Sequence, residues 1–154
     1  MDKKIDFTDE TYYENRELSW IKFDERVLEE ARDKTIPVME RLKFVSITSS
    51  NLDEFYMVRV ASLKDMVHAN YKKKDIAGMT ATEQLVAINN ATRELVSCQY
   101  NTYNRSLLPL LNKEGIYILS HHEEMNDYQA KFVDKYFMEN VYPVLTPMAV
   151  DASR

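Results

Sequence analysis

The stretch that organises the chain is Arg41-Leu-Lys-Phe-Val-Ser-Ile-Thr-Ser-Ser-Asn-Leu-Asp-Glu-Phe-Tyr-Met-Val-Arg-Val60. We predict that a helix ends at 48–51, Thr-Ser-Ser-Asn, and that a second helix begins at once, because Ser50 or Asn51 can serve as its N-cap. Such a helix start exposes unpaired backbone N–H groups and the positive end of a dipole. The simplest interpretation is a tight helix–helix turn. The functional alternative is a site where Asn51 meets a polar or anionic ligand.

The composition favours a helical protein. The chain has 154 residues, 45% of them apolar, which suffices for one compact core and a small attachment. Two glycines and four prolines are few for this length and argue against a turn-rich β fold. The net charge of −5 argues against a general nucleic-acid or anionic-membrane surface. The single cysteine, Cys98, fits a reducing cytoplasm, and no segment has the pattern of a signal peptide or a membrane span.

Apolar periodicity predicts four helices that form a bundle. We expect them from Ser19 to about Arg32, from Pro37 to about Thr48, from about Leu52 to His68, and from Thr80 to about Gly115. A capping box, Thr80-x-x-Glu83, should begin the last helix, Pro109 should kink or restart it, and Gly115 should end it.

Two charged residues interrupt the predicted apolar stripes. Asp24 lies in the stripe of the first helix, and Arg59 lies in the middle of the stripe of the third. A buried charge needs a partner, so one interpretation pairs these two residues. The other lets Arg59 extend its head group to the surface. The third helix is also apolar on its opposite side, through Met57, Val58 and Ala61. We expect that side to be covered by the fourth helix or by a domain outside this chain.

The pattern changes after Gly115. Residues 116–119 favour a strand, Asn126-x-x-Gln129 should cap another helix, and residues 141–150, with two prolines, should be extended. We therefore predict a mainly α protein with an N-terminal helical domain at 1–112, followed at 113–154 by the incomplete start of an α/β or α+β domain.

No catalytic constellation is visible in the residues themselves. His68, His121 and His122 lack metal-ligand spacing with a cysteine or an acidic partner, so we predict surface histidines. The adjacent carboxylates Asp53 and Glu54 would point about 100° apart on a helix, which favours a capping role over acid–base chemistry. No P-loop or nucleophile elbow is present. We assign no catalytic residue and no metal ligand to this chain.

Four segments resemble one enzyme family. They are NRELSWIKFDERVLEEARD at 15–33, PVMERLKF at 37–44, SSNLDEFYMVRV at 49–60 and YPVLTPMAVD at 142–151. In this order they resemble the N-terminal region of the long-chain polyphosphate kinases, which transfer phosphate reversibly between ATP and polyphosphate. The enzymes of that family are several times longer than this chain.

The resemblance implies a helical domain that forms one wall of the ATP site near the adenine. The phosphorylated histidine, the phosphate-binding arginines and the metal ligands of the family lie downstream, so none of them maps onto this chain. One position does map: Asn51 matches the asparagine that contacts ATP at its adenine end. The chemistry is compatible, since a carboxamide offers a donor and an acceptor together, and adenine presents the complementary pair at N6 and N7.

The resemblance also implies ATP and Mg²⁺ as cofactors of the whole enzyme, neither bound tightly by this part. The expected partners are ATP or ADP, polyphosphate and the remaining domains, in a cytoplasmic homo-oligomer that is free or peripheral to the inner membrane. We expect no nucleic-acid partner, no transmembrane segment and no catalysis by these 154 residues alone. The alternative function is a free-standing helical interaction module whose apolar third-helix face docks a partner.

Overall fold

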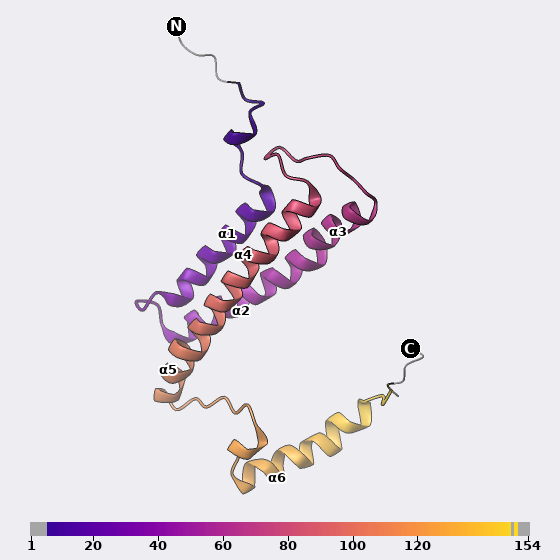
Figure 1. Ribbon diagram of the computed structural model, residues 1–154. Coiled ribbons are helices and arrows are strands. Elements are labelled where there is room, and N and C mark those ends of the chain that lie inside the picture. Colours follow the sequence, from indigo (N-terminus) through magenta and orange to yellow (C-terminus); the bar gives the residue numbers. More distant parts are fainter. Residues whose placement is uncertain (1–5, 149, 151–154) are drawn as a thin grey trace. The chain divides into compact units, whose positions relative to one another are not determined.

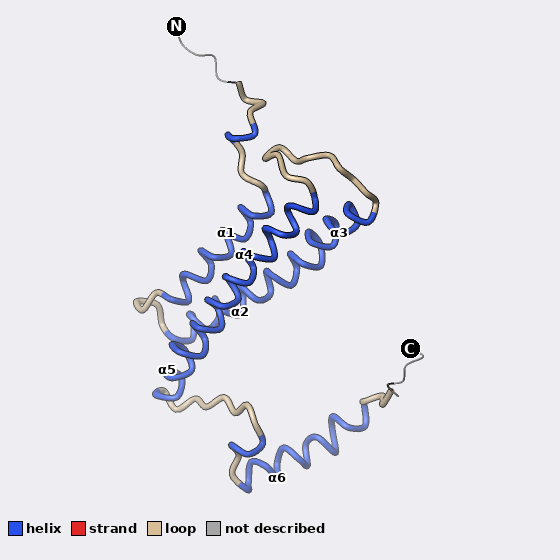
Figure 2. Tube along the Cα trace, viewed as in Figure 1, coloured by secondary structure: helices blue, strands red, loops and turns tan. Residues whose placement is uncertain are grey.

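The computed structural model describes residues 6–148 and 150, and within these residues every regular element is a helix (Figures 1 and 2). This confirms the predicted mainly α class. The chain divides into two compact units, Met1–Ile116 and Tyr117–Arg154. The assignment of 1–112 and 113–154 to two domains stays a prediction, and its residues 1–5, 149 and 151–154 lie outside the described part.

The first long helix begins earlier than predicted. Helix α1 spans Arg16–Arg32, after a short 3₁₀ turn, η1 (Glu10–Tyr12). Its N-cap is Asn15 and not Ser19: the Asn15 side chain accepts hydrogen bonds from the backbone N–H groups of Glu17 and Leu18, both at 3.0 Å. The Asn15 amide also donates to Asp75 at 2.6 Å, which ties the helix start to the loop before the last long helix.

The predicted break at 48–51 is wrong. Helix α2 (Val38–Phe55) continues without interruption through a π turn, η2 (Tyr56–Val60), into α3 (Ala61–His68). Three of the four polar side chains at 48–51 bond to partners other than the backbone of a helix start. The Thr48 hydroxyl donates to the Phe44 carbonyl one turn back at 3.0 Å. Ser49 accepts from Gln99 at 2.6 Å, and Asn51 donates to Asp24 at 2.8 Å.

The π turn explains why Arg59 seemed to lie in an apolar stripe. A π turn inserts one extra residue, so the positions after it are rotated relative to an ideal α-helix. The buried series therefore runs through Leu52, Phe55, Val60 and Leu63, and Arg59 is exposed. The proposed pairing of Asp24 with Arg59 is wrong, since Asp24 bonds to Asn51 and no ion pair joins it to Arg59 in the part of the chain described.

The last long helix keeps its predicted caps. Its segments are α4 (Ala81–Thr102), the π turn η3 (Tyr103–Leu107) and α5 (Leu108–Lys113). The capping box of Thr80 and Glu83 is present, and Pro109 lies in the first turn of α5. Gly115 adopts φ +78°, the left-handed conformation that ends a helix.

Three helical rods make up the first unit, in place of four helices, because α2 and α3 are one rod. Helix α1 packs against α2 and α4, while α3 also packs against α4. The first and last rods run in the same direction and the middle rod runs in the opposite one (Figure 1). The core between them consists of aliphatic side chains and Phe55: Ile21, Leu28, Ala31, Leu52, Phe55, Val60, Leu63, Ala81, Ile88 and Leu95.

The second unit contains α6 (Asp127–Tyr136), the π turn η5 (Phe137–Val141) and the 3₁₀ turns η4 (His122–Glu124) and η6 (Tyr142–Val144). The predicted Asn126 capping box is confirmed. The strand predicted at 116–119 is wrong, and so is the extended start of 141–150. No described segment offers these residues a hydrogen-bonded partner strand, and an isolated strand is not stable. None of the described residues after 116 is buried.

Candidate functional site

A hollow of about 320 Å³ lies between α1 and the rod formed by α2 and η2. We call it the Asn51 groove and define it by its lining residues Trp20, Phe23, Asn51, Glu54, Phe55, Val58 and Arg59. The π turn contributes to this groove directly, because Val58 and Arg59 belong to η2. π turns are frequent at functional sites.

Aromatic rings form one wall of the groove. The rings of Trp20 and Phe55 stack with centroids 4.4 Å apart and an interplanar angle of 4°. Phe55 is 2% exposed, so this wall is anchored in the core, whereas Phe23 is 47% exposed. Phe23 lines the groove, where its exposed aromatic face is available to a flat ligand.

The Asn51 side chain is hydrogen-bonded to a buried carboxylate. Its Nδ2 donates to Asp24 Oδ1 at 2.8 Å, and Asp24 is fully buried. Desolvation raises the pKa of Asp24, and the hydrogen bond from Asn51 lowers that pKa in part. Among the described residues, no group donates to the side-chain oxygen Oδ1 of Asn51 or to Oδ2 of Asp24. The Asn51 amide is therefore oriented by one contact and still has an unused acceptor and an unused N–H.

Asn51 does not lie at a helix start, so the expected free N–H groups and dipole end are absent at this position. It lies inside α2, one turn before the π turn. The capping roles predicted for Asp53 and Glu54 are also wrong, because both lie in the last turn of α2 and are exposed. Any ligand contact at Asn51 must come from its side chain. The exposed Arg59 guanidinium and Glu54 carboxylate supply opposite charges at the groove.

The histidines are surface residues, as predicted. His68, His121 and His122 are all exposed, and His122 lies 3.4 Å from the exposed carboxylate of Asp134. In residues 6–148 and 150, no three His, Cys, Asp or Glu side chains gather in a way that could hold a metal ion. None of the helices described is both long enough and apolar enough to cross a lipid bilayer.

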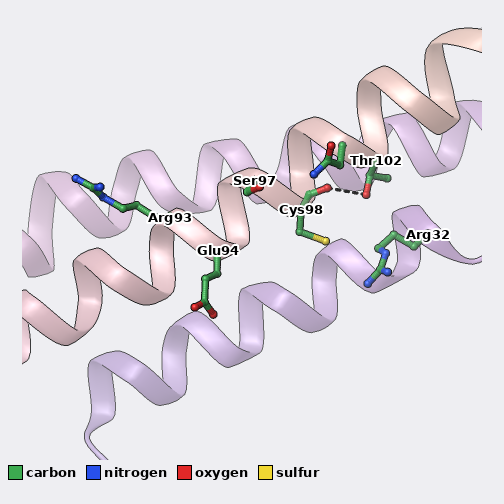
Figure 3. Close-up of a pocket in the computed structure, with 7 residues that line it drawn as sticks. Arg32, Arg93, Glu94, Ser97, Cys98 and Thr102 are labelled. Atoms are coloured by element: carbon green, nitrogen blue, oxygen red, sulfur yellow. Dashed lines mark hydrogen bonds between the residues drawn. The ribbon is translucent and has the colours of Figure 1, made fainter.

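A larger hollow, of about 680 Å³, lies along α4 next to the end of α1 (Figure 3). We call it the Cys98 hollow; it is lined by Arg32, Arg93, Glu94, Ser97, Cys98, Asn101 and Thr102. The guanidinium groups of Arg32 and Arg93 lie toward opposite ends of it, with Glu94 between them (Figure 3). The Thr102 hydroxyl donates to the Cys98 carbonyl at 2.8 Å, so it serves the helix itself. Sequence reasoning did not find this hollow.

Comparisons with known proteins point to one family. The model of the polyphosphate kinase N-terminal domain matches residues 13–119. A polyphosphate kinase of Lactiplantibacillus plantarum is 53% identical over 150 residues, and one of Bacillus anthracis is 50% identical over 151 residues. Each match covers 97% of this chain and 21% of the relative. The chain thus spans about a fifth of the length of these relatives.

The fold agrees with that assignment. The crystal structure of the polyphosphate kinase from Porphyromonas gingivalis matches with a TM-score of 0.70 and 34% sequence identity. The match covers 90% of this chain and 19% of that one. Sequence and structure agree, and the chain belongs to the polyphosphate kinase family, matching its N-terminal domain.

Proposed function

We propose that the Asn51 groove forms the adenine end of the ATP site in a polyphosphate kinase. The observation that carries the proposal is the state of the Asn51 carboxamide. One of its N–H groups is anchored on Asp24, while its carbonyl oxygen and second N–H remain unused beside the stacked rings of Trp20 and Phe55.

The groove suits a purine. The unused acceptor and donor of Asn51 complement adenine, which donates from N6 and accepts at N7. The aromatic wall and the exposed ring of Phe23 offer apolar area to the flat faces of the base. Arg59 supplies a guanidinium, which favours phosphate oxygens over neutral groups. The groove thus provides contacts for the base, and Arg59, beside the opposite charge of Glu54, provides a positive charge for the anionic part of the nucleotide.

The whole enzyme would transfer the terminal phosphate of ATP reversibly to polyphosphate through a phosphohistidine. Mg²⁺, when bound, would neutralise charge on the phosphates, and we place its ligands and the reacting histidine in parts of the enzyme outside this chain. This chain would orient the nucleotide and would not catalyse transfer alone. We extend the same proposal to a cytoplasmic homo-oligomer in which the remaining domains complete the ATP site.

The test is Asn51→Ala in a complete polyphosphate kinase that carries this sequence. An adenine contact binds the ground state and the transition state alike, so KM for ATP should rise while kcat changes less. A lost base contact of this kind should raise KM by about fivefold or more. The control is Ser50→Ala, an exposed neighbour on the same helix that does not line the groove.

Thermal unfolding of each variant must be followed in parallel, because Asn51→Ala also removes the donor to Asp24. A variant that loses stability yet keeps the normal KM for ATP would identify Asn51 as a helix–helix contact only. That result would rule out the nucleotide role proposed for the groove.

A second candidate function rests on the exposed side of η2. Met57 is 71% exposed and Val58 is 53% exposed, so α4 does not cover them as one of our predictions allowed. This apolar surface supports docking of a partner, either the remaining domains of the same enzyme or another protein. If docking occurs there, the 154-residue chain alone should bind a hydrophobic dye, and Met57→Lys should reduce that binding. Equal dye binding by both forms would argue against this surface.

A further inference from the structure

Asp24 is an unusual choice for a buried position. It has 0% exposure, and its hydrogen-bond partner is a neutral amide and not a cation. The other buried carboxylate in the described residues, Glu17, has Arg16 at 2.8 Å. Burying a carboxylate without a cation is costly. A hydrogen bond between α1 and α2 could equally be made by a neutral side chain such as an amide, so the structural bond alone does not account for a carboxylate.

An ionised carboxylate differs from a neutral amide in one property: it can only accept hydrogen bonds. Asn51 must therefore turn Nδ2 toward Asp24 and its carbonyl oxygen away from it. A rotation of the carboxamide by about 180° would place two acceptors, the Asn51 oxygen and the Asp24 oxygen, against each other. Asp24 thus removes one of the two orientations that a carboxamide otherwise adopts.

We propose that Asp24 is a positioning residue that fixes the orientation of the Asn51 carboxamide and thereby makes the groove select adenine over guanine. The inference rests on the proposed function of the groove. Guanine carries the acceptor O6 where adenine carries the donor N6. The fixed Asn51 oxygen meets a donor in adenine and an acceptor in guanine. A flipped carboxamide would instead place an N–H opposite O6.

The test compares ATP and GTP as phosphate donors in the complete enzyme, with the ratio of their kcat/KM values as the readout. The wild type should prefer ATP. Asp24→Asn has nearly the same shape but can donate as well as accept, so it permits both orientations of Asn51. We expect the preference for ATP to fall by about fivefold or more, mainly through KM.

The matched control is Gln99→Leu. Gln99 also joins two helices through a buried amide, donating to the Val45 carbonyl at 2.9 Å and to Ser49 at 2.6 Å, but it does not line the groove. Its loss should loosen the bundle to a similar degree and leave the ATP-to-GTP ratio unchanged. A ratio that falls equally in Gln99→Leu would reflect general loosening and would overturn the positioning role.

The outcomes separate this inference from the function on which it rests. If Asn51→Ala raises KM for ATP and Asp24→Asn leaves the ratio unchanged, the groove binds adenine and Asp24 does not position Asn51. A wild-type enzyme without preference for ATP over GTP would also overturn the inference. If Asn51→Ala leaves KM unchanged, the proposed function fails first. Should Asp24→Asn not fold, Asp24→Ser carries the same expectation, because a hydroxyl also donates and accepts.

Discussion

The Asn51 groove and the Cys98 hollow differ in the contacts that hold their lining side chains in place. The groove is about half the size of the hollow, at 320 against 680 Å³. Its central amide is hydrogen-bonded to a fully buried carboxylate, and its wall is an aromatic pair anchored in the core. The hollow has charged side chains, but none of its lining side chains hydrogen-bonds to another side chain of the described residues.

This difference shows that volume alone does not identify a binding site. A side chain that is fixed before a ligand arrives loses little conformational entropy on binding, whereas a long exposed arginine loses more. Arg32 and Arg93 are exposed, and their positive charges have Glu94 between them. Preorganisation therefore favours the smaller site.

The largest expected effect comes from the aromatic wall. Phe55→Ala removes a side chain that is 2% exposed and stacked on Trp20, so the free energy of unfolding should fall by about 3–5 kcal/mol. Urea denaturation measures this change. The KM for ATP should rise as well, because the wall of the groove is lost.

Leu95→Ala is the matching change in the core between α1 and α4. Leu95 is 2% exposed and lies beside Cys98 in a smaller depression between α1 and α4. The unfolding free energy should fall by about 2–5 kcal/mol with little change in KM for ATP at a temperature where both variants are folded. Equal changes of KM in the two variants would remove the functional distinction between the two sites.

An intermediate effect should depend on pH. Burial raises the pKa of Asp24 above its ordinary value of 3.8. The folded state therefore stabilises the protonated form more than the unfolded state does, although Asp24 is ionised well above its folded-state pKa. Its contribution to stability is fully present below about pH 3.8 and is lost as the pH rises through the folded-state pKa. Relative to the wild type, Asp24→Asn should become more stable across that window, as urea denaturation at a series of pH values would show.

Subtracting the unfolding free energy of the wild type from that of Asp24→Asn at each pH isolates the titration of Asp24. Hydrogen bonds from Thr35 and Thr80 lower the pKa values of the exposed carboxyl groups of Asp33 and Glu83, respectively, and these groups act in the opposite direction in both proteins. Parallel stability profiles of wild type and Asp24→Asn would mean that Asp24 titrates alike in the folded and unfolded states.

The smallest effect is expected at the Cys98 hollow. Arg93→Ala alters an exposed side chain that makes no ion pair in the described residues, so the free energy of unfolding should stay within about 0.5 kcal/mol of the wild type. KM for ATP and for polyphosphate should also be unchanged in steady-state assays. A clear rise of either KM would make the larger hollow a ligand site and reverse the comparison.

Part of the fold follows from local signals. The capping boxes at Thr80 and Asn126 and the stop at Gly115 were predicted correctly, because each depends on residues at most a few positions apart. The break at 48–51 was predicted wrongly for the same reason. Ser49 and Asn51 have the chemistry of caps, but in the folded chain they bond to Gln99 and Asp24, which local reasoning does not bring near.

Sequence reasoning named one residue of the candidate site, Asn51, and did not find the groove around it. Family resemblance singled out Asn51, and periodicity marked Asp24 and Arg59 as anomalies without explaining either. The Arg59 anomaly depends on a feature that helical periodicity does not include, a π turn at Tyr56–Val60 that inserts one residue. After this turn Arg59 is exposed and Val60 is buried, whereas Asp24 is buried as the pattern indicated and accepts a hydrogen bond from Asn51.

The sequence by itself determined the helical class, most helix ends after residue 80 and the kinship to one enzyme family, since these depend on local propensity and matching residue order. Tertiary structure alone decided that 38–68 is one rod, that Asp24 pairs with Asn51, and which face of η2 is open. The physical reason is competition for hydrogen bonds. A Ser or Asn can satisfy a helix end or a neighbouring helix, and only the packed bundle shows which partner is within reach.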